Sequence, residues 1–131
     1  MNSSPGNFTA KSPLYWLCGA FALGLTLVGL LAIFTPVPAS IMFGMPASTI
    51  EAIPWVRLAG IRDVALGLVF FVMMTLKQGR ATGILMLLAV IVPITDAITV
   101  FLRSGLSYQI FIHGSSVIFM IIIGMLLIRS K

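Results

Sequence analysis

Four long apolar segments, each of about twenty residues, constrain what this chain can fold into. At ~1.5 Å per residue, each segment as a helix spans a hydrocarbon core of roughly 30 Å. Lipid offers the backbone no hydrogen-bond partners, and the segments lack the alternating pattern of a membrane barrel. The sequence therefore predicts an all-α fold, an integral membrane antiparallel four-helix bundle. The predicted spans are Leu14–Thr35, Trp55–Leu76, Ala81–Leu102 and Tyr108–Ile128.

The rest of the chain is too short to hold a second domain. With 60% hydrophobic and only 8% charged residues, the composition is that of a membrane protein. We expect a single transmembrane domain over residues 14–131, preceded by a flexible cytoplasmic tail over residues 1–13. Lys77–Arg80 and Arg103–Ser107 are short hairpin turns, and Pro36–Pro54 is a longer connector. No basic run supports binding to nucleic acid, so the partner that the composition indicates is the lipid bilayer.

The formal net charge of +5 indicates an orientation in the membrane. Four crossings place both ends of the chain and the middle hairpin on one face, and Glu51, Arg57 and Arg103 on the other. The first face is the more positive, which predicts that both termini are cytoplasmic. A cleaved signal peptide is the alternative for the first segment, but the apolar run is long and the tail carries little charge. The basic residues of the positive face are Lys11, Lys77, Arg80, Arg129 and Lys131.

Ionisable residues lie inside three of the four apolar segments. Arg62 and Asp63 are in the second, Asp96 is in the third and His113 is in the fourth. A charged side chain is costly in a bilayer, so such residues usually face the bundle interior and often mark a site. Antiparallel helices place all of them about 8–10 Å below the same surface. The sequence therefore predicts one polar layer, in the non-cytoplasmic half of the membrane.

The charges of this layer can cancel. Arg57 and Arg62 remain protonated, because a guanidinium does not release its proton in a protein. Asp63 and Asp96 supply two negative charges, which leaves His113 as a neutral donor and acceptor. We therefore expect a neutral layer that still contains groups able to exchange protons.

Helical spacing indicates how the neighbouring residues are arranged. Gly60 and Gly67 share a face with Asp63, so another helix is expected to approach closely there. Pro93 lies one turn before Asp96 and predicts a kink in the third helix. The polar residues that share a face with Asp96 or His113 are Thr99, Gln109 and Ser116.

The run Arg57-Leu-Ala-Gly-Ile-Arg-Asp-Val-Ala-Leu-Gly, with the later Pro93-Ile-Thr-Asp-Ala, resembles a known family. This is a family of small four-span membrane proteins catalogued as domain of unknown function four-two-six-seven. The resemblance covers nearly the whole chain, from the first span to His113-Gly114. It implies a four-helix membrane fold and names no substrate. The family pattern Arg-x-x-Gly-x-Arg-Asp-x-x-x-Gly is matched by Arg57, Gly60, Arg62, Asp63 and Gly67, and its later Asp and His by Asp96 and His113.

One hypothesis for function is a small membrane-embedded enzyme that acts by acid–base chemistry on a lipophilic molecule. It would be a cofactor-free isomerase, cyclase or hydratase. The catalytic candidates are Asp63, Asp96 and His113, and the substrate-binding candidates are Arg57, Arg62, Thr99, Gln109 and Ser116. We expect no metal site, because one His and two Asp surround an Arg that repels cations.

The alternative hypothesis is a non-catalytic accessory or scaffold subunit. Arg62–Asp96 and Asp63–His113 would then be ties between helices that only fix their packing. The Pro36–Pro54 connector is either a lid over the polar layer or an ordinary interfacial loop. A monomeric transport path is disfavoured because the cytoplasmic half lacks polar groups, whereas a homo-oligomer is compatible with the sequence.

Overall fold

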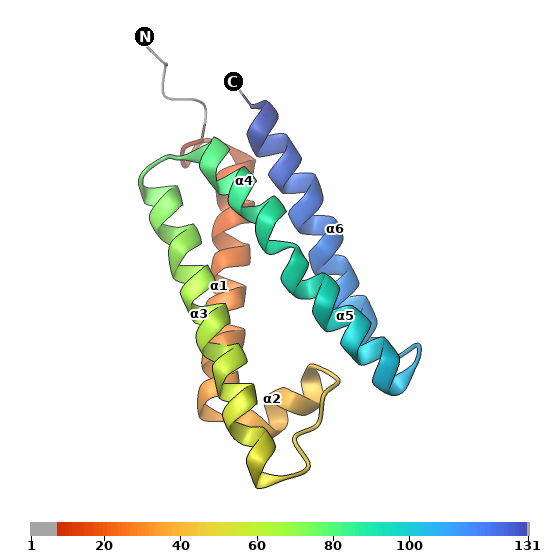
Figure 1. Cartoon of the computed structure of the whole chain (residues 1–131). Coiled ribbons are helices and arrows are strands. Elements are labelled where there is room, and N and C mark those ends of the chain that lie inside the picture. Colours follow the sequence, from red (N-terminus) through yellow and green to blue (C-terminus); the bar gives the residue numbers. More distant parts are fainter. Residues whose placement is uncertain (1–7, 131) are drawn as a thin grey trace.

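Helices make up the regular structure of residues 8–130, which the computed structural model describes (Figure 1). The four predicted spans are all helical, and the connector after the first span contains short helices of its own. The elements are α1 (Pro13–Phe34), α2 (Pro36–Met42), the 3₁₀ helix η1 (Ile50–Ala52), α3 (Ile53–Thr75), α4 (Gly79–Ala89), α5 (Ile91–Ser104) and α6 (Tyr108–Arg129).

Proline starts several of these helices. Pro13 and Pro36 are the first residues of α1 and α2, and Pro54 is the second residue of α3. The first N–H groups of a helix have no intrahelical partner, so proline removes nothing useful there. The prediction that residues 36–54 form only a loop is therefore wrong, because the prolines begin helices instead of preventing them.

The third span is divided between α4 and α5, which meet at Val90. Pro93 lies three residues later and has no N–H to offer the Ala89 carbonyl four residues before it. The missing N–H of Pro93 thus coincides with an interruption of the helix at Val90, whose backbone dihedral angles remain helical. The predicted bend of the helix stays a prediction.

The outer surface of the bundle suits a bilayer. In each of the four spans, only 17–28% of the most apolar window is buried inside the protein. Exposed leucine, isoleucine and phenylalanine side chains cover the helices, including Leu102, Phe111 and Ile118. Such a surface would be unstable in water and is ordinary in lipid. The all-α membrane bundle predicted from the sequence is confirmed.

The four spans form two pairs of helices. α1 packs along α3, and the α4–α5 unit packs along α6, whereas contacts between the pairs are few. Figure 1 shows that the pairs converge at the end that holds both chain termini and diverge at the other end, where α2 lies between them. The polar layer expected from the sequence belongs to the diverging end.

Glycines allow close approach within each pair. A Cβ atom at Gly29 of α1 would lie 2.6 Å from the Gly60 carbonyl oxygen of α3. A Cβ atom at Gly83 of α4 would lie 2.7 Å from the Gly124 carbonyl oxygen of α6. Small residues at a crossing let two backbones touch, which is how helices associate in lipid. The prediction of close packing beside Asp63 is confirmed for Gly60.

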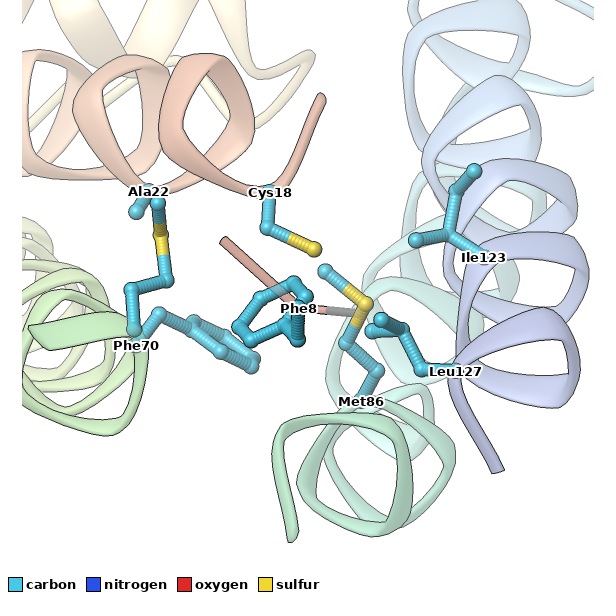
Figure 2. Close-up of a cluster of buried hydrophobic side chains, with 8 residues drawn as sticks. Phe8, Cys18, Ala22, Phe70, Met86, Ile123 and Leu127 are labelled. Carbon is cyan, nitrogen blue, oxygen red and sulfur yellow. The ribbon is translucent and has the colours of Figure 1, made fainter. Parts of the chain in front are cut away.

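The main hydrophobic core closes the converging end. Figure 2 shows Phe8 among side chains of α1, α3, α4 and α6. Phe8 is only 4% exposed. Residue 8 therefore packs in the core, although the sequence assigned it to a flexible tail; residues 1–7 of that tail lie outside the described residues. The other members of this core are Cys18, Ala22, Phe70, Met74, Met86, Ile123 and Leu127.

Candidate functional site

The Arg62 guanidinium connects the two carboxylates of the polar layer. Its Nε–H donates to Asp63 Oδ1 at 2.9 Å, and its Nη2 lies 3.5 Å from Asp96 Oδ2. The first contact joins neighbours on α3, and the second crosses from α3 to α5. The predicted contact between Arg62 and Asp96 is confirmed, and the two helices bring these groups to one depth.

Asp63 is held on the packed face of α3. Its side chain is 9% exposed, and Gly60 and Gly67 precede and follow it on the same buried face. Arg62 directly precedes Asp63 in the chain, and its side chain is 40% exposed. The Asp96 side chain is 35% exposed and stands at the second turn of α5, just after the break at Val90. The two carboxylates therefore have different surroundings, one enclosed and one open.

His113 bonds to the connector and not to Asp63. Its Nε2 lies 3.2 Å from the carbonyl oxygen of Phe43, and the two rings stack with centroids 6.4 Å apart. A carbonyl oxygen only accepts, so Nε2–H of His113 is the donor in this contact. Within residues 8–130, no ion pair or hydrogen bond joins Asp63 to His113, so that predicted tie is not formed.

The connector is shaped to reach α6. Gly44 has φ +82°, a conformation that favours glycine. Gly44 directly follows Phe43, whose carbonyl oxygen bonds to His113. A Cβ atom there would lie 2.9 Å from Cβ of Gln109. Gln109 itself directs its amide nitrogen toward the Ile41 carbonyl oxygen at 3.5 Å. The backbone after α2 therefore lies directly against the start of α6.

Two cavities meet at the polar layer. The first, here the inner cavity, has a volume of about 360 Å³ and extends between the helix pairs toward Phe70 and Met120. The second, the outer cavity, has a volume of about 320 Å³ and lies under the connector, beside Trp55 and Thr99. The five residues that line both cavities are Phe43, Arg62, Asp63, Asp96 and His113.

The remaining predicted site residues fall in different places. Ser116 lines the inner cavity, and its hydroxyl donates to the Ile112 carbonyl. Thr99 lines the outer cavity, and its hydroxyl donates to Thr95. Gln109 lines neither cavity and holds the connector instead.

Arg57 does not join the site. Its side chain is exposed, it lines neither cavity, and it forms no ion pair within the described part of the chain. The expectation that Arg57 and Arg62 together neutralise the two aspartates is therefore wrong. Arg57 precedes Arg62 by five residues, which turns it about 140° away around the helix.

Phe43 and Arg103 belong to the lining but were not among the predicted site residues. Phe43 borders both cavities, and Arg103 borders the outer one. Phe43 lies in an irregular segment, where no periodicity shows which way a side chain points. Arg103 shares a helical stripe with Asp96 and Thr99, and that stripe was the signal that could have identified it. In residues 8–130, no group of three His, Cys, Asp or Glu side chains is placed to hold a metal ion.

Four apolar spans with charged groups gathered inside them define a small multi-pass membrane protein with a buried polar layer. The chain belongs to the DUF4267 family, a domain of unknown function, whose family model matches residues 22–127. That match covers most of the 131 residues and includes the whole polar layer. Searches of curated proteins and of solved structures gave no match.

Proposed function

We propose that this protein binds a lipophilic small molecule between its two helix pairs and exchanges a proton with it. The observation that supports this most is that Arg62, Asp63, Asp96 and His113 all line two cavities. A volume of about 360 Å³ is within the range of small-molecule sites. A layer that served packing alone would gain nothing from empty space beside its charges, because unfilled volume lowers stability.

The chemistry that these groups offer is acid–base catalysis. Asp63 and Asp96 differ in exposure, which suits one carboxyl group to give a proton and the other to take one. Nδ1 of His113 is a second acceptor, since Nε2 is committed to the Phe43 carbonyl. Arg62 would stabilise negative charge that develops on a substrate oxygen. The reaction class that needs only these groups is isomerisation, cyclisation or hydration.

The membrane supplies the route to the site. The inner cavity lies between pairs of helices that diverge, so a lipophilic molecule would enter from the bilayer. The five basic residues on the side of the termini favour an arrangement with both termini in the cytoplasm. The polar layer would then open toward the opposite face.

Filling the inner cavity tests the binding. Gly24 lines it, and a Cβ atom added there meets no atom within 4 Å, so Gly24→Leu would occupy the cavity without forcing helices apart. Gly114 is equally open but lines neither cavity, so Gly114→Leu is the matched control. The probe is a long-chain alcohol carrying a photoreactive diazirine, added to purified protein in nanodiscs. Saturable labelling should occur in the wild type and in Gly114→Leu and disappear in Gly24→Leu; equal labelling of all three would refute the proposal.

Catalysis is tested with the lipophilic molecules that co-purify with the protein. The wild type should convert one of them to an isomer, or to a product that has gained one water, as mass spectrometry would detect. At a saturating concentration of this molecule, Asp96→Asn should convert it at least a hundredfold more slowly, a loss on the order of that for a general acid or base. Conversion by Asp96→Asn at the wild-type rate would exclude this role for Asp96.

A non-catalytic accessory role is the second candidate. It is favoured by one observation, the Arg62–Asp96 contact that ties α3 to α5 where the helix pairs contact each other little. On this proposal, Arg62→Gln would reduce the amount of folded protein and nothing else. A folded Arg62→Gln protein with altered labelling by the probe would argue against it.

A further inference from the structure

The charges around the inner cavity do not balance. Its charged lining consists of one guanidinium and two carboxylates: Arg62, Asp63 and Asp96. Arg57 points elsewhere, and Arg103 borders only the outer cavity. By formal charge, the carboxylates of this lining therefore outnumber the guanidinium by one. Arg103 can offset the second carboxylate only from the outer cavity, so the inner side of Asp96 has no cation other than Arg62. A charge without a close partner is costly at this depth in a membrane.

Asp96 is the carboxylate that remains open. Asp63 takes the 2.9 Å hydrogen bond from Arg62, whereas Asp96 has only the 3.5 Å contact with Nη2. Among residues 8–130, no donor forms a hydrogen bond with the Asp96 carboxylate. Its side chain is 35% exposed and faces both cavities. A carboxylate has acceptor sites for several donors, so most of those of Asp96 are free.

Apart from His113 and Ser116, the rest of the side chains that line the inner cavity are apolar. Phe21 and Leu25 of α1, Leu66 and Phe70 of α3, and Met120 of α6 form the wall that leads away from Asp96. The Phe43 side chain lines the polar end, where its ring stacks on that of His113. A molecule that fits this cavity has an apolar body and one polar head at the carboxylate.

We propose that the inner cavity takes a lipophilic amine in its protonated form, with the ammonium group bound to Asp96 and the apolar body between the helix pairs. The ammonium supplies a positive charge and hydrogen-bond donors on the side of Asp96 that faces the inner cavity. An anionic head would instead stand beside two carboxylates with only Arg62 to attract it. This inference rests on the proposed function and names the ligand class of the same site.

The experiment compares three photoreactive probes with the same diazirine chain, one ending in an amine, one in a carboxylate and one in an alcohol. Each is titrated against purified protein in nanodiscs of zwitterionic lipid, and the labelled peptides are mapped by mass spectrometry. We expect the amine to label residues of α1, α3 and α6 that border the inner cavity, at concentrations at least tenfold lower than the alcohol. Labelling should saturate and should be competed by the unlabelled amine.

Variants identify the contact. Asp96→Asn should weaken labelling by the amine on the order of tenfold and leave labelling by the alcohol unchanged. Asp96→Glu keeps the charge and should recover most of the binding of the amine, which separates loss of charge from loss of fold. Glu51→Gln is the matched control, since Glu51 is exposed in η1 and its loss removes one negative charge outside the cavities.

The outcomes distinguish the ligand class from the proposed function. Equal labelling by amine and alcohol, or no effect of Asp96→Asn, would overturn the ligand class. If Gly24→Leu still blocked the alcohol in that case, the proposed lipophilic site would survive. The proposed ligand class would also be overturned if the protein preferred the probe that ends in a carboxylate and Arg62→Gln removed that preference. The ligand would then be an anion. If no probe labels saturably, both proposals fail.

Discussion

The crossing of α1 and α3 gives a sharp test of the packing that positions Asp63. Gly29 of α1 faces Gly60 of α3, and a methyl group at Gly29 would lie 2.6 Å from the Gly60 carbonyl oxygen and 2.8 Å from the Val64 nitrogen. Both are backbone atoms, which a change of rotamer cannot move. Ordinary carbon–oxygen contacts are ~3.3–3.6 Å, so Gly29→Ala requires the helices to separate by roughly 0.7–1 Å.

The expected cost follows from two opposed effects. Overpacking of a tight contact costs ~1–3 kcal/mol, while replacing glycine by alanine within a helix gains up to ~1 kcal/mol. Gly24→Ala lies on the same helix and meets no atom within 4 Å, so it has the gain without the cost. The difference in free energy of unfolding between the two variants is therefore the steric cost, ~1–3 kcal/mol, with Gly29→Ala the less stable.

Equilibrium unfolding by SDS in mixed micelles, followed by circular dichroism, measures this difference under one set of conditions. Both variants replace glycine by alanine within α1, so the contribution of helix propensity to the free energy of unfolding cancels in the comparison. If Gly29→Ala were as stable as Gly24→Ala, the close contact between α1 and α3 would be refuted. The placement of Asp63 one turn beyond Gly60 would then lose its support.

Two further predictions concern the polar layer and the connector. Arg62→Gln should lower the free energy of unfolding by up to ~3 kcal/mol, the lower end of the range for an unpaired buried charge, because Arg62 is 40% exposed. Adding Asp63→Asn should restore at least half of that loss in the same SDS titration, and a double variant no more stable than the single one would contradict the pairing. Gly44→Ala should expose the connector to limited proteolysis, since it combines a positive φ with a contact on Gln109. Gly105→Ala has a positive φ but open space, so equal protease sensitivity of the two variants would count against packing of the connector on α6.

The two hypotheses for the polar layer make different demands on the structure. A structural tie needs only the Arg62–Asp96 contact, whereas a binding site also needs space beside it. The diverging helix pairs provide that space, because Phe8 and the core around it hold the pairs together only at the opposite end. The location of the core is thus what leaves the polar layer beside cavities.

The sequence by itself determined the class of fold and the depth of the charges. Four apolar runs of membrane length allow little except helices, since lipid leaves backbone groups no other partners. Fixed rise per residue then sets depth, which is why Arg62 and Asp96 were expected at one level and do make contact. The Gly60 face and the interruption of the helix before Asp96 were also predictable, because helical periodicity and the missing N–H of Pro93 are local properties.

Only the tertiary structure decided which of these groups meet and what lies between them. Arg57 and Gln109 have suitable chemistry, yet Arg57 is exposed outside both cavities and Gln109 contacts the connector. Phe43 reaches the site through an irregular segment, whose path depends on its bond to His113 and on the positive φ of Gly44. Whether helix pairs converge or diverge depends on packing between residues far apart in the chain, such as Phe8 and Leu127, which belong to one core. Periodicity within one helix carries no information about those contacts, so the cavities beside Asp96 had to be found in the structure.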